Sequence, residues 1–313
     1  MDYQPIVTIS VTAYNSSRYI RETLESIKAQ TYKNIILQIA DDCSTDNTVD
    51  ICKRWIEENK DRFVKTKIIT SEKNTGVSTN CNREWDACET DWFKGIAGDD
   101  ILLPNCIEDN VNYVLEHPDT VVVFSKLVPF SIEKGIKVRK KPIHNYSFFS
   151  FSREKQYRCL FEYGNVLPAP SAFYNMKKIK QLNYKHDIRI PLLEDYPKWI
   201  SLIRLGIEFH FFEKETVEYR FNDNSLSIGL LSPRYYESNM LFYLYYYLDE
   251  VGRLGDRDYI FKLIAEKETM LYSNAYNEVI SLRKKLYEIE NSTIYKILFS
   301  PLKKCKSIIK RLF

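Results

Sequence analysis

Two adjacent aspartates, Asp99 and Asp100, are the residues of this chain whose type and placement most directly suggest chemistry. They follow an apolar run, Trp92–Ala97, that we expect to form a buried strand, and Pro104 leads the next loop into a helix. Because like charges repel, neighbouring carboxylates at a strand end are costly unless a cation neutralises them. Mg²⁺ and Mn²⁺ prefer oxygen ligands, and Mg²⁺ commonly takes one or two carboxylates together with substrate phosphates. The pair therefore indicates a metal–diphosphate site, with an acidic turn that caps the next helix as the alternative.

A second acidic pair, Glu194 and Asp195, opens an expected helix whose apolar residues Trp199, Ile200 and Ile203 would face inward. Acidic side chains are favoured at a helix N-terminus because they oppose the positive end of the helix dipole. A carboxylate held there can also remove a proton from a substrate hydroxyl. Taken alone, the pair favours the first role, and the second depends on the rest of the chain.

Both pairs need a scaffold, and the first part of the chain predicts alternating strands and helices. Short apolar, β-branched runs indicate buried strands, and apolar residues three and four apart indicate helices with one buried face. We expect N-caps at Ser16 or Ser17 and at Ser44, because serine is favoured there. This order predicts a parallel sheet with helices on both faces and ligands beyond the carboxyl ends of its strands. The expected strands are Ile6–Val11, Ile35–Ala40, Val64–Thr70, Trp92–Ala97 and Val121–Phe124, and the expected helices span Ile20–Ile27, Val49–Ile56, Val77–Cys88 and Ile107–Glu116.

Polar side chains follow each of the first four expected strands. If turn formation alone selected these residues, we would expect more glycine and proline and less aspartate. The four strand ends should therefore meet in one polar site at the carboxyl edge of the sheet. They are Thr12–Asn15, Asp41–Asp46, Asn74–Val77 and Asp99–Asp100.

Five segments in this order resemble the motifs of the family 2 glycosyltransferases, which have the GT-A fold. They are VTISVTAYNSSRYIRETLESIKAQTYKNI, LQIADDCSTDNTV, NTGVSTNCN, GDDILLPN and LLEDYPKWISLIRLG, and the resemblance covers residues 5–230. Each segment alone is a weak signal, and their order and spacing together are specific. The resemblance implies an α/β fold with a Rossmann-like, mixed but mostly parallel sheet flanked by helices. It also implies a nucleotide-diphospho-sugar donor, a divalent metal, and transfer with inversion at the anomeric carbon.

The resemblance implies a donor site and a metal site. Asp42 would accept a hydrogen bond from the imide N–H of uracil or thymine. Asp100 would bind Mn²⁺ or Mg²⁺ directly, Asp99 would contact the ribose or the metal, and the metal would neutralise the diphosphate leaving group. Thr12 and Tyr14 would line the base pocket. The implied donor-binding residues are Thr12, Tyr14, Asn15, Asp42, Asn74, Gly76, Asn82 and Asp99.

On the acceptor side, the resemblance implies that Asp195 is the general base. It would take the proton of an acceptor hydroxyl as that oxygen attacks the anomeric carbon opposite the leaving nucleotide. This scheme needs no covalent intermediate. Glu194 would orient the acceptor or its neighbours, and Arg220 would contact phosphate or acceptor.

Three positions depart from the pattern of the family. The first acid of the DxDD motif is Ala97, the arginine of ARN is Cys81, and the histidine of YRxH is Asn222. The metal site therefore rests on Asp99 and Asp100, and a cation expected near the nucleotide is missing at position 81.

Composition narrows the class of protein. The chain has 313 residues, of which 44% are hydrophobic, enough for one large domain or two smaller ones. Its seven cysteines are scattered without a CxxC pair, which suits reduced cytoplasmic thiols better than disulfides or zinc. We expect no signal peptide, because charges interrupt the N-terminal apolar runs, and no membrane span, because no apolar run nears about 20 residues.

Basic residues gather at the C-terminal end. Residues 291–313 hold six lysines and arginines and no acid, which leaves 39 basic against 42 acidic residues elsewhere. Apolar residues alternate with these charges, so we expect amphipathic helices on an anionic membrane surface, with a helix packed on the body as the alternative. The protein would then be cytoplasmic and peripheral at the inner face of the plasma membrane.

The chain divides into four expected parts. Residues 1–125 form the nucleotide-sugar-binding half, 126–230 the acceptor and catalytic-base half, 231–290 a C-terminal helical extension, and 291–313 the basic amphipathic tail. Within them, we expect loops and irregular structure after Lys126 and a tyrosine-rich helix over Tyr235–Leu248.

The leading hypothesis is an inverting glycosyltransferase that moves a sugar, from a UDP-linked donor, to a hydroxyl of a glycan or lipid-linked saccharide in cell-surface polysaccharide synthesis. The alternatives are a nucleotide-sugar hydrolase that uses the same site and a catalytically idle nucleotide-sugar-binding subunit. A dehydrogenase is disfavoured because no GxGxxG follows the first strand. A nucleic-acid partner is disfavoured because the body of the chain is net acidic.

Overall fold

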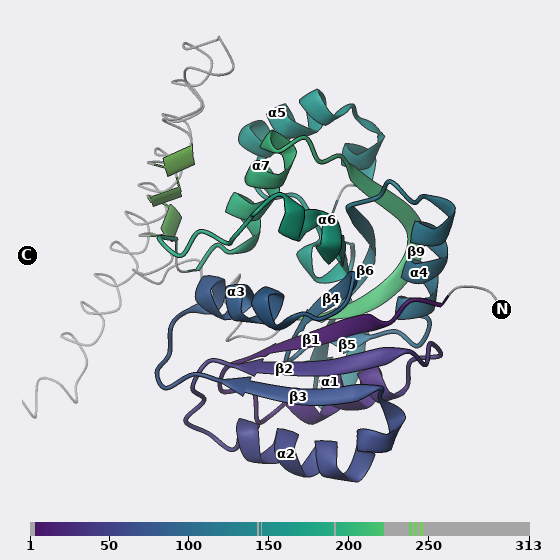
Figure 1. Cartoon of the computed structure of the whole chain (residues 1–313), viewed down its shortest axis with the longest axis vertical. Helices are drawn as coiled ribbons and strands as arrows, with labels where there is room; N and C mark the ends of the chain where they lie inside the picture. Colours follow the sequence, from purple (N-terminus) through teal and green to yellow (C-terminus); the bar gives the residue numbers. More distant parts are fainter. Residues whose placement is uncertain are drawn as a thin grey trace, which may run out of the picture. The chain divides into compact units, whose positions relative to one another are not determined.

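The computed structural model describes residues 4–142, 144, 146–190, 192–221, 238–239, 241–242 and 245–246 (Figure 1). This part of the chain is built on one mixed β-sheet with helices on both faces, which confirms the predicted α/β fold. The strand order is β3-β2-β1-β4-β8-β6-β9-β5, and β7 pairs with β6 outside this path. The strands are β1 Val7–Ala13, β2 Ile35–Asp41, β3 Lys65–Thr70, β4 Trp92–Ala97, β5 Ile101–Leu102, β6 Val122–Glu133, β7 Ile136–Arg139, β8 Phe173–Asn175 and β9 Phe209–Arg220.

The first four strands of the predicted alternation form the parallel half of the sheet. Strand β1 pairs with β2 on one side and with β4 on the other, and β3 pairs with β2, all in parallel. Every residue of β2 is buried, and so is every residue of β1 except Thr12. Burial on both faces explains why these strands are continuous apolar, β-branched runs. As predicted, their carboxyl ends meet at one edge of the sheet.

Helices cover the two faces of the sheet differently. On one face, Leu24 of α1, Trp55 of α2 and Val111 of α4 pack with Ile9 of β1 in the main apolar core. On the other face, α3 lies over polar strand residues, where the Gln38 amide nitrogen donates to the backbone oxygen of Glu84 at 3.0 Å. Figure 1 shows α1 and α2 on one side of the sheet and α3, α6 and α7 on the other. The helices are α1 Ile20–Lys28, α2 Thr48–Asn59, α3 Val77–Ala87, α4 Cys106–Glu116, α5 Arg153–Tyr163, α6 Met176–Gln181 and α7 Asp195–Arg204, with short 3-10 turns at Lys60–Arg62, Tyr146–Ser150 and Ala169–Ser171.

The sheet extends further along the chain than the sequence indicated. Strand β6 continues through Lys126 to Glu133, and a turn at Lys134–Gly135 leads into β7. The expectation of irregular structure after Lys126 is therefore wrong for this stretch. The pairing of β6 with β9 shifts register on both sides of Lys126. Such a bulge interrupts the two-residue alternation by which a strand is recognised in a sequence.

Two predicted N-caps are wrong, although both helices begin at or next to the residue that the apolar pattern predicted. Helix α1 begins at Ile20, after Ser16 and Ser17, and α2 begins at Thr48, after Ser44. The serines instead bond within the loops that precede the helices: the Ser16 backbone N–H donates to the Thr48 hydroxyl at 2.8 Å. The polar turns after β1 and β2 therefore hold each other before either helix begins.

The later part of the chain is described only at a few positions. Ser238–Asn239 and Leu241–Phe242 are helical and Tyr245–Tyr246 form a wider helical turn, in agreement with part of the predicted Tyr-rich helix. The rest of the helical extension, the basic tail and Asn222 lie outside the described residues, and the four-part division stays a prediction. Across the described ranges, no helix combines the length and apolar character needed to cross a membrane. The six cysteines in these ranges are free thiols.

Candidate active site

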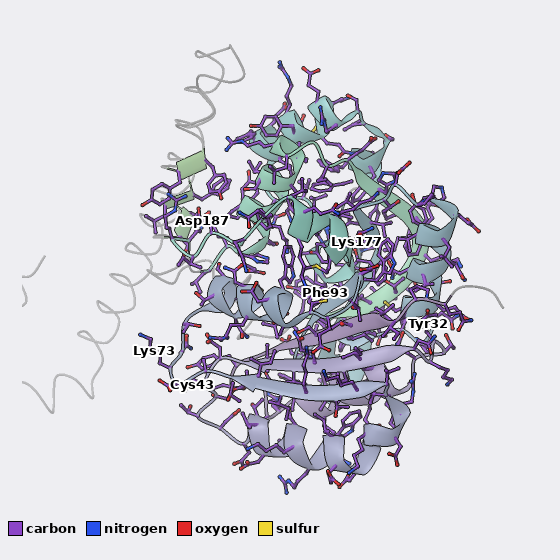
Figure 2. All side chains as sticks on the ribbon, viewed as in Figure 1. Tyr32, Cys43, Lys73, Phe93, Lys177 and Asp187 are labelled. Carbon is purple, nitrogen blue, oxygen red and sulfur yellow. The ribbon has the colours of Figure 1, made fainter. Side chains whose placement is uncertain are left out.

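Asn15 joins the loops that follow β1 and β2. Its backbone N–H donates to the Ser44 hydroxyl at 2.8 Å, and its side-chain oxygen accepts from the Thr45 N–H at 2.8 Å. Asn15 and Cys43 have φ of 49° and 65°, in the left-handed region that asparagine tolerates better than most residues. Figure 2 labels Cys43 in this loop region, with Lys73 of the neighbouring loop close by in the same view. The predicted donor residue Asn15 thus fixes the edge of the candidate site.

Thr12 and Tyr14 lie where β1 meets the aspartate loop. The Thr12 carbonyl oxygen accepts from the Gly98 N–H at 2.9 Å, one residue before Asp99. A Cβ atom at Gly98 would lie 3.0 Å from the Ser16 hydroxyl, so that glycine permits this close approach. The Tyr14 side chain is 47% exposed. An accessible aromatic ring therefore stands beside the loop that carries the acidic pair.

Asp42 holds the loop that follows β3. One of its carboxylate oxygens accepts from the backbone N–H groups of Thr75 and Gly76, at 3.0 and 2.7 Å. The other oxygen accepts from the Thr75 hydroxyl at 2.7 Å and from the Arg83 guanidinium at 2.6 Å. The side-chain oxygen of Asn74 also accepts from the Gly76 N–H, at 3.1 Å. The structure thus brings together three predicted donor residues, Asp42, Asn74 and Gly76.

The electrostatics of this cluster favour an ionised Asp42. The residue is 3% exposed. Burial by itself raises the pKa of the Asp42 carboxyl, but the bonds from Arg83, Thr75 and Gly76 hold this pKa below its usual value. Because Arg83 is the nearest cation, Asp42 and Arg83 form a largely buried ion pair under the loop.

The two carboxylates of the predicted metal pair, Asp99 and Asp100, differ in how deeply they are buried. Asp100 is 1% exposed, and one of its carboxylate oxygens accepts from the Arg220 backbone N–H at 2.9 Å. Its second oxygen is buried without a hydrogen-bond partner. Burial, followed by the charge of Asp99, raises the pKa of Asp100 well above its usual value. Asp99 is partly exposed, so its carboxylate is the more accessible of the two.

Arg220 ties the end of β9 to the aspartate loop. Its Nε donates to the Asp99 backbone oxygen at 2.7 Å, and its Nη2 donates to Glu22 at 2.7 Å. The guanidinium carbon lies 4.5 Å from the Tyr19 ring centroid and 4.7 Å from that of Phe130. The side chain of Arg220 therefore positions the aspartate loop, and its contact with phosphate or acceptor stays a prediction.

The two aspartates fit a divalent cation with an incomplete protein shell. A buried carboxylate oxygen without a partner, as on Asp100, is costly unless a proton or cation compensates it. Within the described ranges, no three His, Cys, Asp or Glu side chains are grouped closely enough to hold a metal by themselves. Mg²⁺ commonly takes one or two carboxylates and completes its shell with water and phosphate oxygens. The residues present therefore suit an ion held jointly with a diphosphate.

The second acidic pair opens α7, as predicted. Asp195 is the first helical residue, and Trp199 and Ile200 behind it are fully buried. One Asp195 carboxylate oxygen accepts from the Asn165 side-chain amide at 2.6 Å, and the other accepts from the Tyr196 N–H at 2.8 Å. The carboxylate is thus oriented by its own helix and by the loop that follows α5.

Glu194 differs electrostatically from a solvent-exposed glutamate. Burial and the charge of Asp195 raise the pKa of its carboxyl and the ammonium of Lys198 lowers it, which leaves this pKa at about 7. At neutral pH, Glu194 is therefore protonated in a substantial fraction of the molecules. A carboxyl in that state can donate a hydrogen bond as well as accept one.

Helix α3 links the donor-side loops to the segment that leads into α7. The Ser78 hydroxyl donates to the Ile190 backbone oxygen at 2.9 Å. The Asn82 amide donates to the His186 backbone oxygen at 3.0 Å, and its side-chain oxygen accepts from the His186 N–H at 2.8 Å. Asn82, predicted as a wall of the nucleotide site, therefore ties α3 to the segment before the acidic pair. The other predicted residues form three groups. The loops after β1, β2 and β3 hold Asn15, Asp42, Asn74 and Gly76. The end of β1, the aspartate loop and the end of β9 hold Thr12, Tyr14, Asp99, Asp100 and Arg220, and the start of α7 holds Glu194 and Asp195.

Three residues of the site were missed from the sequence. Arg83 lies two positions after Cys81 on α3 and brings a guanidinium to Asp42, a placement that helical spacing could have indicated. Lys198 is a buried lysine beside the acidic pair, and its position three residues after Asp195 was a usable signal. Asn165 comes from a distant loop, and no local pattern points to it.

The arrangement offers the parts of a group transfer. Two carboxylates at the carboxyl edge of the sheet can hold a cation against a diphosphate. A separate carboxylate, with oxygens that accept one protein hydrogen bond each, can accept a proton from a hydroxyl.

Known proteins share both the sequence pattern and the fold. The family model described as Glycosyl transferase family 2 matches residues 8–182. The Escherichia coli protein WfaP, a UDP-Glc:alpha-D-GlcNAc-diphosphoundecaprenol beta-1,3-glucosyltransferase, is 25% identical over 236 residues, which cover 75% of this chain and 85% of WfaP. The family model begins in β1 and so includes the parallel half of the sheet, where the donor-side loops lie.

Two solved structures share the fold at low sequence identity. S. aureus TarS 1–349 in complex with UDP-GlcNAc superposes with a TM-score of 0.58 and 18% identity, over 83% of this chain and 71% of that one. The mannosyltransferase PcManGT from Pyrobaculum calidifontis, in complex with GDP-Man and Mn²⁺, gives 0.54 and 12%, over 96% and 84%. These likenesses establish a GT-A type of fold. Because the family model spans more than half of the sequence, the chain belongs to glycosyl transferase family 2.

Proposed function

We propose that this protein is an inverting glycosyltransferase that moves a sugar from a UDP-linked donor to a hydroxyl of a glycan or lipid-linked saccharide. The product would enter bacterial cell-surface polysaccharide synthesis. The observation that carries this proposal is the presence of two separate carboxylate groups, Asp99 and Asp100 after β4 at the sheet edge and Asp195 at the start of α7. The relative WfaP, whose name states a UDP-Glc donor and a diphosphoundecaprenol acceptor, supports the classes of donor and acceptor.

The donor base would lie on the loop held by Asp42, next to Tyr14. Protein donors occupy two acceptor positions on each oxygen of Asp42: the Thr75 and Gly76 N–H groups on one, and the Thr75 hydroxyl and the Arg83 guanidinium on the other. The imide N–H of uracil would therefore have to displace one of these donors. The Thr75 hydroxyl, which can rotate away, is the one that would yield. A base that presents a carbonyl at this point would meet a repulsive carboxylate instead.

The diphosphate would lie at Asp99 and Asp100. Mn²⁺ or Mg²⁺ bound there would supply positive charge to the leaving diphosphate. Asp99, the more exposed residue, would hold the ion or the ribose, and the buried Asp100 would hold the ion from below. Arg220 and Gly98 keep this loop close to β1 and β9, so that both carboxylates start in position.

Asp195 would remove the proton from the acceptor hydroxyl. A carboxylate oxygen has about two acceptor positions, and the bonds from Asn165 and Tyr196 occupy one on each oxygen. As the acceptor oxygen forms its bond to the anomeric carbon, the bond from that carbon to the phosphate oxygen breaks on the opposite face. The proton passes to Asp195, UDP leaves, and the configuration at the anomeric carbon inverts. Glu194, protonated in part at neutral pH, would orient the acceptor.

The basic residues of 291–313 would bring the enzyme to an anionic membrane surface, where a lipid-linked acceptor is found. This part of the proposal rests on the sequence, because the segment lies outside the described residues. Each basic residue near such a surface contributes about 1 kcal/mol. Vesicle sedimentation with and without anionic lipid, compared for the full chain and a chain ending at residue 290, tests it.

The proposed activity is tested with purified full-length protein, a panel of UDP-sugars and a lipid-linked saccharide acceptor. We expect release of UDP that depends on the acceptor and on Mn²⁺, together with a glycosylated product whose new bond has the opposite anomeric configuration. UDP release at the same rate without acceptor would favour the hydrolase. Binding of UDP-sugars without turnover for any acceptor would favour the idle subunit.

A further inference from the structure

Helix α7 buries a lysine beside the candidate catalytic pair. Lys198 lies three residues after Asp195 and four after Glu194, and it is only 7% exposed. Its Nζ lies 4.3 Å from the centroid of the Trp199 ring and 5.4 Å from that of Tyr174. An ammonium group is costly to bury unless nearby charges and rings compensate it. The reason for burying one here should therefore lie in its neighbours.

Those neighbours are acidic groups on three elements. Burial by itself lowers the pKa of Lys198, but the surrounding acids raise this pKa above its usual value of 10.5. The acids responsible are the Tyr174 phenol of β8, the Cys81 thiol of α3, and the carboxyls of Glu194 and Asp195. Lys198 is thus a permanent cation, enclosed between α3, β8 and the start of α7.

Helical spacing directs this cation at the acidic pair. Residues three and four apart lie on one face of a helix, so Lys198 shares a face with both Asp195 and Glu194. Lys198 lowers the pKa of Glu194, against the effects of burial and of Asp195. It likewise lowers the pKa of Glu84, against burial, which is the larger effect and leaves this pKa at about 7. This one buried cation therefore opposes the rise in pKa that burial causes in several carboxyl groups.

We propose that Lys198 is a positioning residue that balances the negative charge of the Glu194–Asp195 pair, with which it shares a helix face, and so keeps this pair competent as the proton acceptor. The inference rests on the proposed function of Asp195 and deepens it. Lys198 is too enclosed to meet the substrates and acts through the pair alone. It also supplies a cation on the α3 side of the pair, next to position 81, where the family pattern places an arginine and this chain has a cysteine.

Other groups around the pair bear on its protonation and must be kept constant in a test. They are Cys81 and Glu84 of α3, Tyr174 of β8, the neighbouring Lys185 and His186, and His144, whose pKa burial lowers and the charge of Asp195 raises. Substituting Lys198 alone leaves all of these in place.

The test compares Lys198→Met, which removes the charge at similar volume, with Lys198→Arg, which keeps it. A cation stabilises carboxylates, so its loss raises their pKa, and activity then fails at a higher pH. In Lys198→Met, the acidic limb of the kcat/KM profile should move up by about one pH unit or more. The limb of Lys198→Arg should stay near that of the wild type. Lys177→Met on the exposed surface of α6 (Figure 2) is the matched control and should leave it unchanged.

A readout without turnover separates this inference from the proposed activity. Carboxyl-carbon NMR titration, with Asp195→Asn used to assign the Asp195 signal, should show higher pKa values for the pair in Lys198→Met. If that shift occurs in a protein that transfers no sugar, the proposed activity fails and the charge role stands. An unchanged titration in folded Lys198→Met overturns the inference.

Should Lys198→Met fail to fold, the wild-type lysine itself can be titrated by side-chain nitrogen NMR. We expect Lys198 to remain protonated beyond pH 10.5, its ordinary pKa, and to lose its proton at lower pH in Glu194→Gln. A Lys198 that loses its proton below 10.5 in the wild type would contradict the inference, because the carboxylates of the pair would then not stabilise its charge.

Discussion

The donor-side edge of the sheet and the start of α7 position their carboxylates by different means. At the sheet edge, Asp42, Asp99 and Asp100 follow parallel strands, and their place is set mainly by backbone pairing and by backbone donors such as the Gly76 and Arg220 N–H groups. At α7, Asp195 depends on a side chain from a remote loop, Asn165, and on a buried lysine of its own helix. Substitutions at the edge should therefore disturb binding and stability together, and those at α7 should mainly disturb turnover.

The largest effect is expected for Asp195→Asn. The amide cannot accept the acceptor proton, and loss of a general base commonly slows a reaction by about 10²–10⁴-fold. The UDP affinity should remain near that of the wild type, because the described partners of the Asp195 carboxylate are Asn165 and Tyr196, which lie outside the donor loops. Steady-state turnover and calorimetric UDP titration, run on the same preparation, give both numbers. Near-normal turnover would refute the assignment of the base.

Asp99→Asn and Asp100→Asn should weaken donor binding in the presence of Mn²⁺. A hydrogen bond or contact to a charged group contributes about 1.5–3 kcal/mol, which corresponds to about 10–100-fold in affinity. Without Mn²⁺, both variants should bind UDP nearly as the wild type does. Equal losses with and without the ion would show that these carboxylates serve the loop and not the metal.

The ion pair of Asp42 and Arg83 should contribute to stability as well as to the donor wall. Removing one partner of a buried pair leaves an uncompensated charge, so Arg83→Met should lower the free energy of unfolding by about 3 kcal/mol. Asp42→Asn should lower the free energy of unfolding less in the Arg83→Met background than in the wild type, since the two side chains are in contact. Denaturant unfolding of the two single variants and the double variant measures this coupling. Strict additivity would contradict the pairing.

The pH dependence of stability should carry the signature of Asp42. Its pKa is lower in the folded protein than the ordinary value of 3.8. The stabilisation is therefore complete above that ordinary value and is lost as the pH falls through the lower, folded pKa. Unfolding measured through this acidic range should show a shallower loss of stability in Asp42→Asn than in the wild type. Parallel curves would rule out this contribution.

The smallest effect is expected for Ser78→Ala, which removes the bond from α3 to the Ile190 backbone oxygen. A hydrogen bond of this kind contributes about 1 kcal/mol to stability. If α3 transmits order to the acidic pair, kcat should fall more than the UDP affinity does. The matched change Ser150→Ala, at an exposed position, should alter neither quantity.

The same contrast explains what could be predicted from the sequence. Strands β1 and β2 are buried on both faces and β3 is only partly buried, yet the alternation of strands with helices was enough to predict the parallel arrangement and the convergence of the polar strand ends. Strand β6 was predicted only as far as Phe124, because a bulge near Lys126 breaks the alternation of its residues. The serine caps were assigned wrongly because the Ser17 N–H donates to Asp46 and the Ser44 hydroxyl accepts from the Asn15 N–H, and these contacts between two loops are not encoded in a local pattern.

Within the site, residue identity predicted which acids would meet but not what holds them. No sequence pattern near Asp42 predicts its contact with Arg83, which comes from α3, and none near Asp195 predicts its contact with Asn165. Lys198 is local to the pair, but its burial follows from Trp199, Tyr174 and α3 closing over it. Partners that come from distant elements are fixed by tertiary packing, which a local pattern does not encode.

The most direct test of the account is thermal unfolding of the purified protein with UDP, GDP and ADP, each with and without Mn²⁺. A ligand that binds only the folded state raises the melting temperature by mass action. We predict a rise with UDP that is larger with Mn²⁺, absent with ADP and GDP, and reduced in Asp99→Asn. No rise with any nucleotide diphosphate, or a rise that ignores both Mn²⁺ and Asp99→Asn, would contradict the proposed donor site.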